Sequence, residues 1–426
     1  MRKIFLLLLV GMFFTNSLYS QLTWLPVNNA PTELRIEDVS FINDTTGFLE
    51  ANDTIYKTTN AGLTWNMSGT FPAAYVRSIE FINDSVGFIG TLQQNPTPAG
   101  IFKTEDGGAT WTNINSLLTS RPAWGICGIA HYNNSIVAVG SVITESNLYY
   151  SHNAGASWTH INLSSLANAL IDVYMFDSLT WLVTGKSDTG TGQKATILRT
   201  TDGGATWARV ALASAPNTYC WKLYFQPNGI GYGSIEDFTS AALFKTVDDG
   251  ITWQEIIVTG ITQSDVGAVA GINDTTIWLG IQHNVGYLES NNGGASWIYM
   301  NYGLNMNRMF IPPGGSPICV GSTVYKYGLL SGFLPEATFG DAHEISLYPN
   351  PSKDVIHLKI DLSTATPLYI IITDLKGKLI HLLDHSYHPS GEIDYRVDVN
   401  DYATGTYVAI VISNQQNFGK KFEVIK

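Results

Sequence analysis

Short apolar segments alternate with polar turns along almost the whole chain. An apolar stretch, a polar turn and a second apolar stretch recur seven times, within residues 41–50, 81–90, 131–140, 175–185, 224–233, 271–280 and 311–321. Apolar runs of four to eight residues bounded by turn residues are typical of β-strands. The pattern therefore predicts an all-β protein built from many short strands.

An octapeptide is repeated six times between these segments. It reads Ser or Thr, any residue, Asp or Asn, any residue, Gly, any residue, Thr or Ser, and finally Trp. Its third and eighth positions are occupied by Asn60 and Trp65, Asp106 and Trp111, Asn153 and Trp158, Asp202 and Trp207, Asp248 and Trp253, and Asn292 and Trp297. Successive tryptophans lie 44 to 49 residues apart, which is the spacing of four-stranded propeller blades.

Each octapeptide has the composition of a tight turn. Its Asp or Asn can accept hydrogen bonds from backbone N–H groups of the same turn, and the Gly two residues later permits a positive φ. The octapeptides resemble the Asp-box, or BNR repeat, of sialidases, sortilin-type receptors and propellers of the photosystem II stability and assembly factor family. This resemblance covers about residues 22–330 and implies a β-propeller, but it does not specify an activity. Because three of the six third positions carry neutral Asn, we expect a structural role for these residues.

Seven strand–turn–strand segments with only six octapeptides predict a seven-bladed ring that is closed by its two ends. Residues 22–24 look like the end of a further octapeptide, and residues 324–327 look like a third strand with no octapeptide after it. We expect the segment around Trp24 to complete the last blade of a propeller that spans residues 21–330.

The repeat ends near residue 329, and residues 331–344 read as a linker. Strands with turns between them predict a small Ig-like β-sandwich over residues 345–426. Four segments of this region resemble the C-terminal sorting domain of the type IX, or Por, secretion system, through Pro349, Asn350, Pro351, Asp374, Gly377, Gly405, Tyr407 and Lys420. The resemblance implies the type IX machinery and its sortase-like peptidase as partners, and a location at the cell surface or outside the cell.

The first twenty residues have the order of a secretory signal peptide. Arg2 and Lys3 precede an apolar run over residues 4–14, and the small residue Ser20 precedes Gln21. This run is too short to span a bilayer, for which about 20 residues are needed. We expect residues 1–20 to direct export and the mature chain to have no transmembrane segment.

The composition argues against several classes of function. The net charge is −12, whereas binding to nucleic acid requires clustered Lys and Arg. Cys127, Cys220 and Cys319 lie in apolar, strand-like stretches, so we predict that they are buried free thiols. The chain has no metal-ligand spacing, nucleophile elbow or phosphate loop, so we expect neither a metal nor a cofactor.

We expect a binding face at the end of the ring opposite the octapeptides. Just before expected innermost strands of four blades lie Arg35, Arg77, Arg121 and Arg308, with Tyr75, Trp124 and Trp221 in neighbouring positions. Arginines and aromatic residues together are typical of surfaces that recognise carboxylates, peptides or sugars, so the ligand could be a glycan, a peptide or a protein. The alternative is that the arginines pair with Glu37, Asp38, Glu80 or Asp172 and fill the central channel.

A glycoside hydrolase is the alternative function. A sialidase is disfavoured because Arg35-Ile36-Glu37 lacks the proline of the Arg-Ile-Pro motif that marks that family. Another glycosidase would need two carboxylates on the loop face, about 5 to 10 Å apart, with one of them in an apolar setting. The catalytic residues of such an enzyme are not identified by the sequence.

Overall fold

The computed structural model describes residues 23–71, 75–92, 100–118, 123, 125–140, 145–188, 190–237, 239–259, 264–312, 316–328, 345–362, 366–374, 379–384, 387–413 and 416–426. They form two compact units, one of Thr23–Gly328 and one that ends at Lys426. The expected signal peptide and linker lie outside the described residues, as do Arg121, Trp124 and Gly377. Regular structure in the described chain is β-strand apart from one short 3-10 helix, η1 (Asn115–Leu117), so the predicted all-β class is confirmed.

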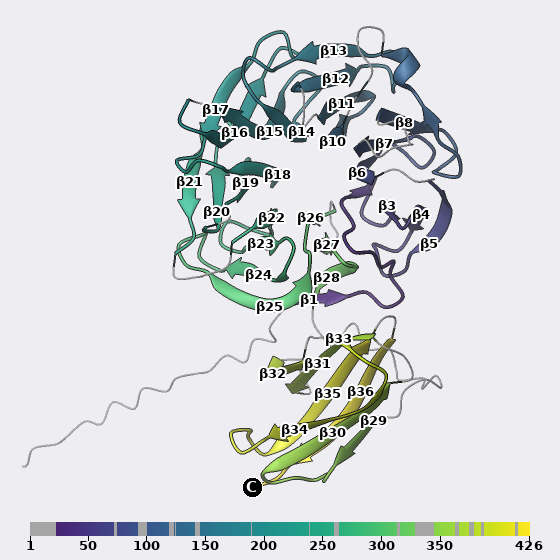
Figure 1. Ribbon diagram of the computed structural model, residues 1–426, viewed down its shortest axis with the longest axis vertical. Coiled ribbons are helices and arrows are strands. Elements are labelled where there is room, and N and C mark those ends of the chain that lie inside the picture. Colours follow the sequence, from purple (N-terminus) through teal and green to yellow (C-terminus); the bar gives the residue numbers. More distant parts are fainter. Residues whose placement is uncertain are drawn as a thin grey trace, which may run out of the picture. The chain divides into compact units, whose positions relative to one another are not determined.

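Thr23–Gly328 contains seven four-stranded antiparallel sheets. Six of them are continuous in sequence: β2 (Val39–Phe41), β3 (Gly47–Ala51), β4 (Thr54–Thr58) and β5 (Asn66–Thr70); β6 (Tyr75–Phe81), β7 (Gly87–Leu92), β8 (Gly100–Thr104) and β9 (Thr112–Asn113); β10 (Ile126–Tyr132), β11 (Ser135–Gly140), β12 (Asn147–Ser151) and β13 (Thr159–Asn162); β14 (Ala169–Met175), β15 (Trp181–Asp188), β16 (Gln193–Thr200) and β17 (Ala208–Leu212); β18 (Tyr219–Phe225), β19 (Gly231–Glu236), β20 (Ala242–Thr246) and β21 (Gln254–Ile257); β22 (Val266–Gly271), β23 (Ile277–Ile281), β24 (Val285–Ser290) and β25 (Ile298–Leu304). The sheets surround a common centre like the blades of a propeller, and β6, β10, β14, β18 and β22 are the innermost strands of their sheets (Figure 1).

The remaining sheet is built from both ends of this unit. It consists of β26 (Arg308–Phe310), β27 (Ile318–Val320), β28 (Val324–Gly328) and β1 (Thr23–Pro26). β1 pairs with β28 so that Trp24 lies opposite Tyr327, as the sequence predicts. Trp24 is fully buried against the rings of Tyr327 and Trp278, so the N-terminal strand is part of the core.

The six octapeptides form turns with the same hydrogen bonds. In each, the Gly N–H donates to the first-position hydroxyl at 2.9 to 3.1 Å. The third-position side chain accepts from the N–H of the seventh residue at 2.8 to 2.9 Å. The fifth-position glycines have φ between +71° and +95°. The hydrogen bonds explain why the third position is Asp or Asn, and the positive φ explains why the fifth position is Gly. Both residues therefore have a structural role within the turn.

The hydrophobic core lies between neighbouring sheets. One buried cluster joins Val137 and Leu148 to Trp181 and Val183 of the following sheet. The next cluster joins Leu182 to residues that include Cys220. All three cysteines are buried free thiols, as predicted from their apolar surroundings.

The octapeptide turns lie at the same end of the ring as the hairpins that join the first two strands of each sheet. Backbone N–H groups of these turns donate to hairpin carbonyls, as in Ala61 to Thr45, Gly107 to Ser85, Gly203 to Leu179 and Gly293 to Thr275. The loops that lead into the innermost strands are therefore at the opposite end, which is where the sequence analysis expects a binding face.

The C-terminal unit consists of two antiparallel sheets around one core. One contains β29 (Ile345–Tyr348), β30 (Val355–Leu362) and β34 (Gly391–Asp398); the other contains β32 (Leu379–Asp384), β31 (Thr366–Asp374), β35 (Gly405–Ser413) and β36 (Gln416–Val424), with β33 (Tyr387–His388) paired to β31. The buried members of the core include Leu358 of one sheet and Ile370 and Phe422 of the other. No helix within the described chain has the length and hydrophobicity required to cross a membrane.

The segment after β29 fastens the last strand of the chain. The Asn350 side chain accepts from the Glu423 N–H at 2.8 Å and donates to the Lys421 carbonyl at 3.2 Å. Ser352 continues this contact through backbone hydrogen bonds with Glu423 and Ile425, both 2.9 Å. This region therefore acts as a short extra strand on the outer edge of β36.

Other residues of the expected sorting motif also have structural roles. Lys420 donates to the carbonyl of Ile345 at 3.0 Å, and the Tyr407 hydroxyl donates to the carbonyl of Ala403 at 2.8 Å. Asp374 is opposite Tyr407 in the pairing of β31 with β35. These contacts join the two ends of the motif within one unit.

Candidate functional site

Polar and aromatic side chains gather at the centre of the ring because the innermost strands are irregular. Five of these strands shift register near their beginning, between Val76 and Ser78, Ile126 and Gly128, Leu170 and Val173, Cys220 and Leu223, and Val266 and Ala268. A β-bulge interrupts strand alternation and redirects side chains. Arg77, Asp172, Trp221 and Lys222 lie at these positions. Side chains from sheets that are distant in sequence meet at the centre, as in the contacts of Arg308 with Asp172 and of Arg77 with Trp221.

Glu37 accepts hydrogen bonds from two arginines and an asparagine. Its carboxylate accepts from Arg35 Nε at 2.8 Å, from Arg77 at 2.7 Å and from Asn307 Nδ2 at 2.7 Å. The Tyr75 hydroxyl donates to the same carboxylate. Only 4% of the Glu37 side chain is exposed. Two guanidinium groups thus share one buried carboxylate.

The charges around Glu37 keep it ionised. Burial disfavours its charged form, but the guanidinium groups of Arg77 and Arg35 outweigh burial and lower the pKa of Glu37 to about 2. The same carboxylate keeps the pKa of Arg77 above its ordinary value in spite of burial. This cluster has two positive charges and one negative charge.

Cations and aromatic rings form a row, which we call the ladder, at the end of the ring opposite the octapeptides. We call this end the mouth. The Lys186 ammonium lies 4.1 Å from the centre of the Tyr219 ring, and this ring stacks on Trp221 at 5.9 Å. The guanidinium carbon of Arg77 lies 5.2 Å from the Trp221 ring and 5.8 Å from the Tyr75 ring. Each contact is within the range of cation–π or stacking interactions. The ladder connects β15, β18 and β6.

A second acidic cluster closes the circle of contacts. The Trp221 indole N–H donates to Glu236 at the end of β19. Asp265 lies beside it, since the Asp265 backbone N–H donates to the Asp237 carbonyl at 3.3 Å and Asp265 helps to raise the pKa of Glu236. His283 is 3.0 Å from Asp265 Oδ2 through Nδ1, and its Nε2 is 3.0 Å from Arg35. We use the term mouth ring for Arg35, Glu37, Arg77, Trp221, Glu236, Asp265 and His283.

A separate charged layer includes Arg308. Its guanidinium lies 2.8 Å from Asp172 and 3.3 Å from Asp38. Lys222 is buried nearby, and burial lowers the pKa of its ammonium although Asp38 and Asp172 oppose this shift. These residues lie in or next to the innermost strands of four sheets and occupy the centre of the ring.

The structure brings together some of the residues expected at the binding face. Arg35, Tyr75, Arg77 and Trp221 are joined in one network, whereas Arg308 pairs with Asp172 and Asp38 in its own layer. Arg121 and Trp124 lie outside the described residues.

The positions of two arginines differ from the sequence expectation. Arg77 lies within β6 and Arg308 begins β26, because these innermost strands begin earlier than expected. The pairing of arginines with Glu37, Asp38 and Asp172, considered as an alternative, is present. Glu80 instead contacts His131 at 2.7 Å.

Sequence reasoning missed the acidic half of the mouth ring. Glu236, Asp265 and His283 belong to no motif and lie at strand ends or in connections. The available signal was a charged residue next to an apolar strand, as in the segment Gly233-Ser234-Ile235-Glu236. Such a residue is expensive to bury without a partner, which marks it for attention but does not identify its partner.

Several polar atoms near the mouth lack partners among the described residues. Arg77 Nε and Gln282 Nε2 are buried donors without an acceptor, and Asp265 Oδ1 is a buried oxygen without a donor. Buried polar groups are normally hydrogen-bonded. These three atoms are buried, so they belong to the interior of the network and do not themselves face a ligand at its surface.

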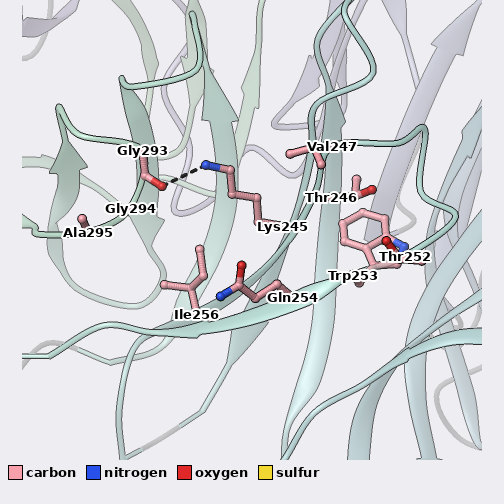
Figure 2. A pocket seen from close by; sticks show the side chains of 10 residues that line it. All are labelled: Lys245, Thr246, Val247, Thr252, Trp253, Gln254, Ile256, Gly293, Gly294 and Ala295. Carbon is pink, nitrogen blue, oxygen red and sulfur yellow. Dashed lines mark hydrogen bonds between the residues drawn. The ribbon is translucent and has the colours of Figure 1, made fainter.

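A pocket at the octapeptide end offers less chemistry. It has a volume of about 590 Å³ and lies between the fifth and sixth octapeptides. Its lining comprises Lys245, Thr246, Val247, Thr252, Trp253, Gln254, Ile256, Gly293, Gly294 and Ala295 (Figure 2). Lys245 donates to the Gly293 carbonyl at 2.9 Å. This bond joins two neighbouring sheets, and the lining contains no carboxylate or histidine.

Comparison with known proteins identifies the C-terminal region. The family model of the secretion system C-terminal sorting domain matches residues 346–426. The match indicates export by the type IX secretion system to the cell surface or the extracellular space, and contact of this tail with the secretion machinery. No curated protein sequence matches the chain significantly.

Solved structures show that the first unit has a β-propeller fold. A structure of YCF48 bound to D1 peptide is 19% identical, with a TM-score of 0.52, over 71% of this chain and 96% of the other. YCF48 from Cyanidioschyzon merolae is 16% identical, with a TM-score of 0.51, over 71% and 98% of the two chains. An ancestral GH74 enzyme is 16% identical, with a TM-score of 0.53, over 94% of this chain and 63% of the enzyme. At these identities the similarity concerns the fold.

Proposed function

We propose that this protein is a binding module displayed at the cell surface or released from the cell. In this proposal residues 1–20 are a signal peptide and residues 21–330 form a closed, seven-bladed Asp-box propeller. Residues 331–344 form a linker, and residues 345–426 form an Ig-like sorting domain that a sortase-like peptidase removes. The mouth ring is the observation that supports binding, since it places the partly exposed Arg35 guanidinium and Trp221 indole in one network with the exposed imidazole of His283.

The expected ligand presents oxygen acceptors, such as a carboxylate, to the mouth ring. Arg35 and Arg77 share the single charge of Glu37, and Arg35 is the more exposed of the two, with 14% of its side chain exposed against 6% for Arg77. Charge-assisted hydrogen bonds to a carboxylate are among the stronger polar contacts. A peptide is a reasonable first class of probe because a propeller of similar fold was solved with a bound peptide, and acidic glycans offer the same chemistry.

Binding arrays and one pair of variants test this proposal. The purified protein is applied to arrays of peptides and acidic glycans, and the best probe is measured by calorimetry against Arg35→Gln and Lys57→Gln. Arg35 belongs to the mouth ring, while Lys57 forms an exposed pair with Asp84 at the other end. We expect Arg35→Gln to weaken binding at least 10-fold and Lys57→Gln to leave it unchanged. Equal affinity of both variants, with melting temperatures retained, would place the binding site elsewhere.

A glycosidase is the second candidate, favoured by one observation. Glu236 is largely buried at the mouth, and its pKa is raised to about 7 by burial and by Asp265, which suits a general acid. However, Asp265 is so close to Glu236 that it helps to raise the pKa of Glu236, whereas glycosidases separate their two carboxyl groups by about 5 to 9.5 Å. Hydrolysis of chromogenic glycosides by the wild type but not by Glu236→Gln would favour the enzyme.

A further inference from the structure

Glu236 and Asp265 are two neighbouring acidic residues beside an indole: Asp265 helps to raise the pKa of Glu236, and the Asp265 backbone N–H donates to the carbonyl of Asp237, the residue after Glu236, at 3.3 Å. The Trp221 N–H donates to Glu236 Oε2, so one Glu236 oxygen is occupied by the ring. Asp265 Oδ2 is occupied by His283 at 3.0 Å. The other Asp265 oxygen, Oδ1, is buried and has no donor among the described residues.

A proton between the two carboxyl groups would satisfy this oxygen. Two ionised carboxylates in contact repel each other, and one of them then holds its proton more tightly. With the proton present, the pair has an O–H donor and an acceptor, and its charge falls from −2 to −1. The unpartnered Asp265 Oδ1 is the oxygen that such a bond would occupy.

The charged and titratable groups that face this pair come from four directions. β18 contributes Tyr219 and Trp221, and Tyr219 is itself in contact with Lys186. The segment before β2 contributes Arg35, which favours the ionised form of Glu236. His283 follows β23 and lies between Asp265 and Arg35. Asp237 is adjacent to Glu236 in the chain.

We propose that Glu236 and Asp265 hold a single proton between them, and that this proton determines how well the mouth ring accepts an anionic ligand. The part concerning the ligand rests on the proposed function, whereas the part concerning the proton rests on the contacts of Trp221 and His283 with the two acidic groups and on the buried, unpartnered Asp265 Oδ1. Loss of the proton adds a negative charge to a ring whose arginines are already partly neutralised by Glu37. Anion affinity therefore falls as the pH rises.

The titration of Glu236 sets the range of pH in which this occurs. Burial, reinforced by Asp265, raises the pKa of Glu236 to about 7. Glu236 is thus expected to change charge between about pH 6 and pH 8. One added charge at the mouth should change the affinity for an anion by roughly 3- to 10-fold across this range.

Trp221 reports on the proton without any ligand. In full-length protein labelled with ¹⁵N-tryptophan, the indole N–H resonance that disappears in Trp221→Phe belongs to Trp221. We expect this resonance to titrate with a midpoint near pH 7 in the wild type and to lose that titration in Glu236→Gln. The matched control is Glu289→Gln, which should leave the titration of the Trp221 resonance unchanged. Glu289 also accepts from an indole, that of Trp278, at 3.1 Å, but its other partner is the amide of Asn291 and not a second acidic group.

The outcomes separate this inference from the proposed function. A Trp221 resonance that does not titrate between pH 5 and 9, or that titrates equally in Glu236→Gln, overturns the shared proton whatever the protein binds. If Trp221 titrates as expected, the affinity for the carboxylate-bearing array probe is measured at pH 6 and pH 8. A 3- to 10-fold decrease at pH 8, absent in Glu236→Gln, supports control by the proton. An affinity independent of pH overturns that control, and failure to bind any probe overturns the proposed function.

Discussion

Glu37 is the shared counter-charge of two arginines, Arg35 and Arg77, and partly neutralises them. Glu37→Gln keeps the shape of the side chain but leaves the guanidinium groups of Arg35 and Arg77 without their shared counter-charge. Because breaking a buried ion pair costs about 3 to 5 kcal/mol, we expect a loss of that order in the free energy of unfolding by urea. Glu105→Gln is the control, because the Glu105 side chain is 72% exposed and such pairs contribute little.

The lowered pKa of Glu37 also predicts how the free energy of unfolding depends on pH. The pKa of Glu37 is about 2 in the folded protein and its ordinary value is 4.5, so the unfolded chain binds the proton more readily between these values. The stabilisation by Glu37 is therefore complete above about pH 4.5 and is lost as the pH falls towards 2. If the stability difference between the wild type and Glu37→Gln did not decrease over this range, the ion pairs would not be its cause.

Gly204 is a second residue whose role can be tested. Its φ is +88°, and an added Cβ would lie 2.6 Å from Ile161 Cδ1. We expect Gly204→Val to lower the free energy of unfolding by about 1 to 3 kcal/mol, because a strained backbone has a cost of this order. Ala205→Val changes the next, exposed residue of the same turn and should have little effect. Similar stability of the two variants, measured by urea unfolding, would contradict the argument.

At the scale of elements, the segment around Asn350 should determine how firmly the last strand is held. Asn350→Ala removes the hydrogen bonds to Glu423 and Lys421 and exposes part of the edge of β36. We expect faster hydrogen exchange at the Glu423 amide and less protein exported, because the matched tail contains this strand. Asn400→Ala, in an exposed turn, is the control. Unchanged exchange at Glu423 would show that β36 is held by other contacts.

The sequence predicted the elements better than their details. The octapeptides repeat in every sheet but one, and the turn they form depends only on local hydrogen bonds, so it is visible from spacing. The bulges at Arg77 and Trp221 are different, because they depend on how an innermost strand fits against its neighbours in the ring. The sequence pattern therefore predicts where strands recur but not which side chains are redirected to the centre.

At the scale of the whole molecule, export and folding should be separable. The two units have separate hydrophobic cores, so deletion of residues 344–426 should leave a folded propeller that remains in the periplasm. Cell fractionation locates the truncated protein, and circular dichroism with thermal melting tests its fold. Truncated protein in the medium or on the cell surface would show that the tail is not required for export.

The candidate site was predictable only in part, because it depends on the closure of the whole ring. Arg35, Tyr75, Arg77 and Trp221 could be proposed from their positions before or within innermost strands. Their partners Glu236 and Asp265 come from the end of one strand and the connection before another. Closure of the ring brings them together, and neither local propensity nor hydrophobic periodicity contains this information.

The pairing of β1 with β28 has a consequence for how the gene could be rearranged. Thr23 lies opposite Gly328 in this pairing, so the two ends of the propeller are a strand spacing of about 5 Å apart. A short peptide could join them, and new ends could then be opened in the hairpin at Asn83 and Asp84, which is exposed. Such a circular permutant would keep all seven sheets but begin at a different one. The position at which the secretion tail is attached would thus become a matter of genetic choice.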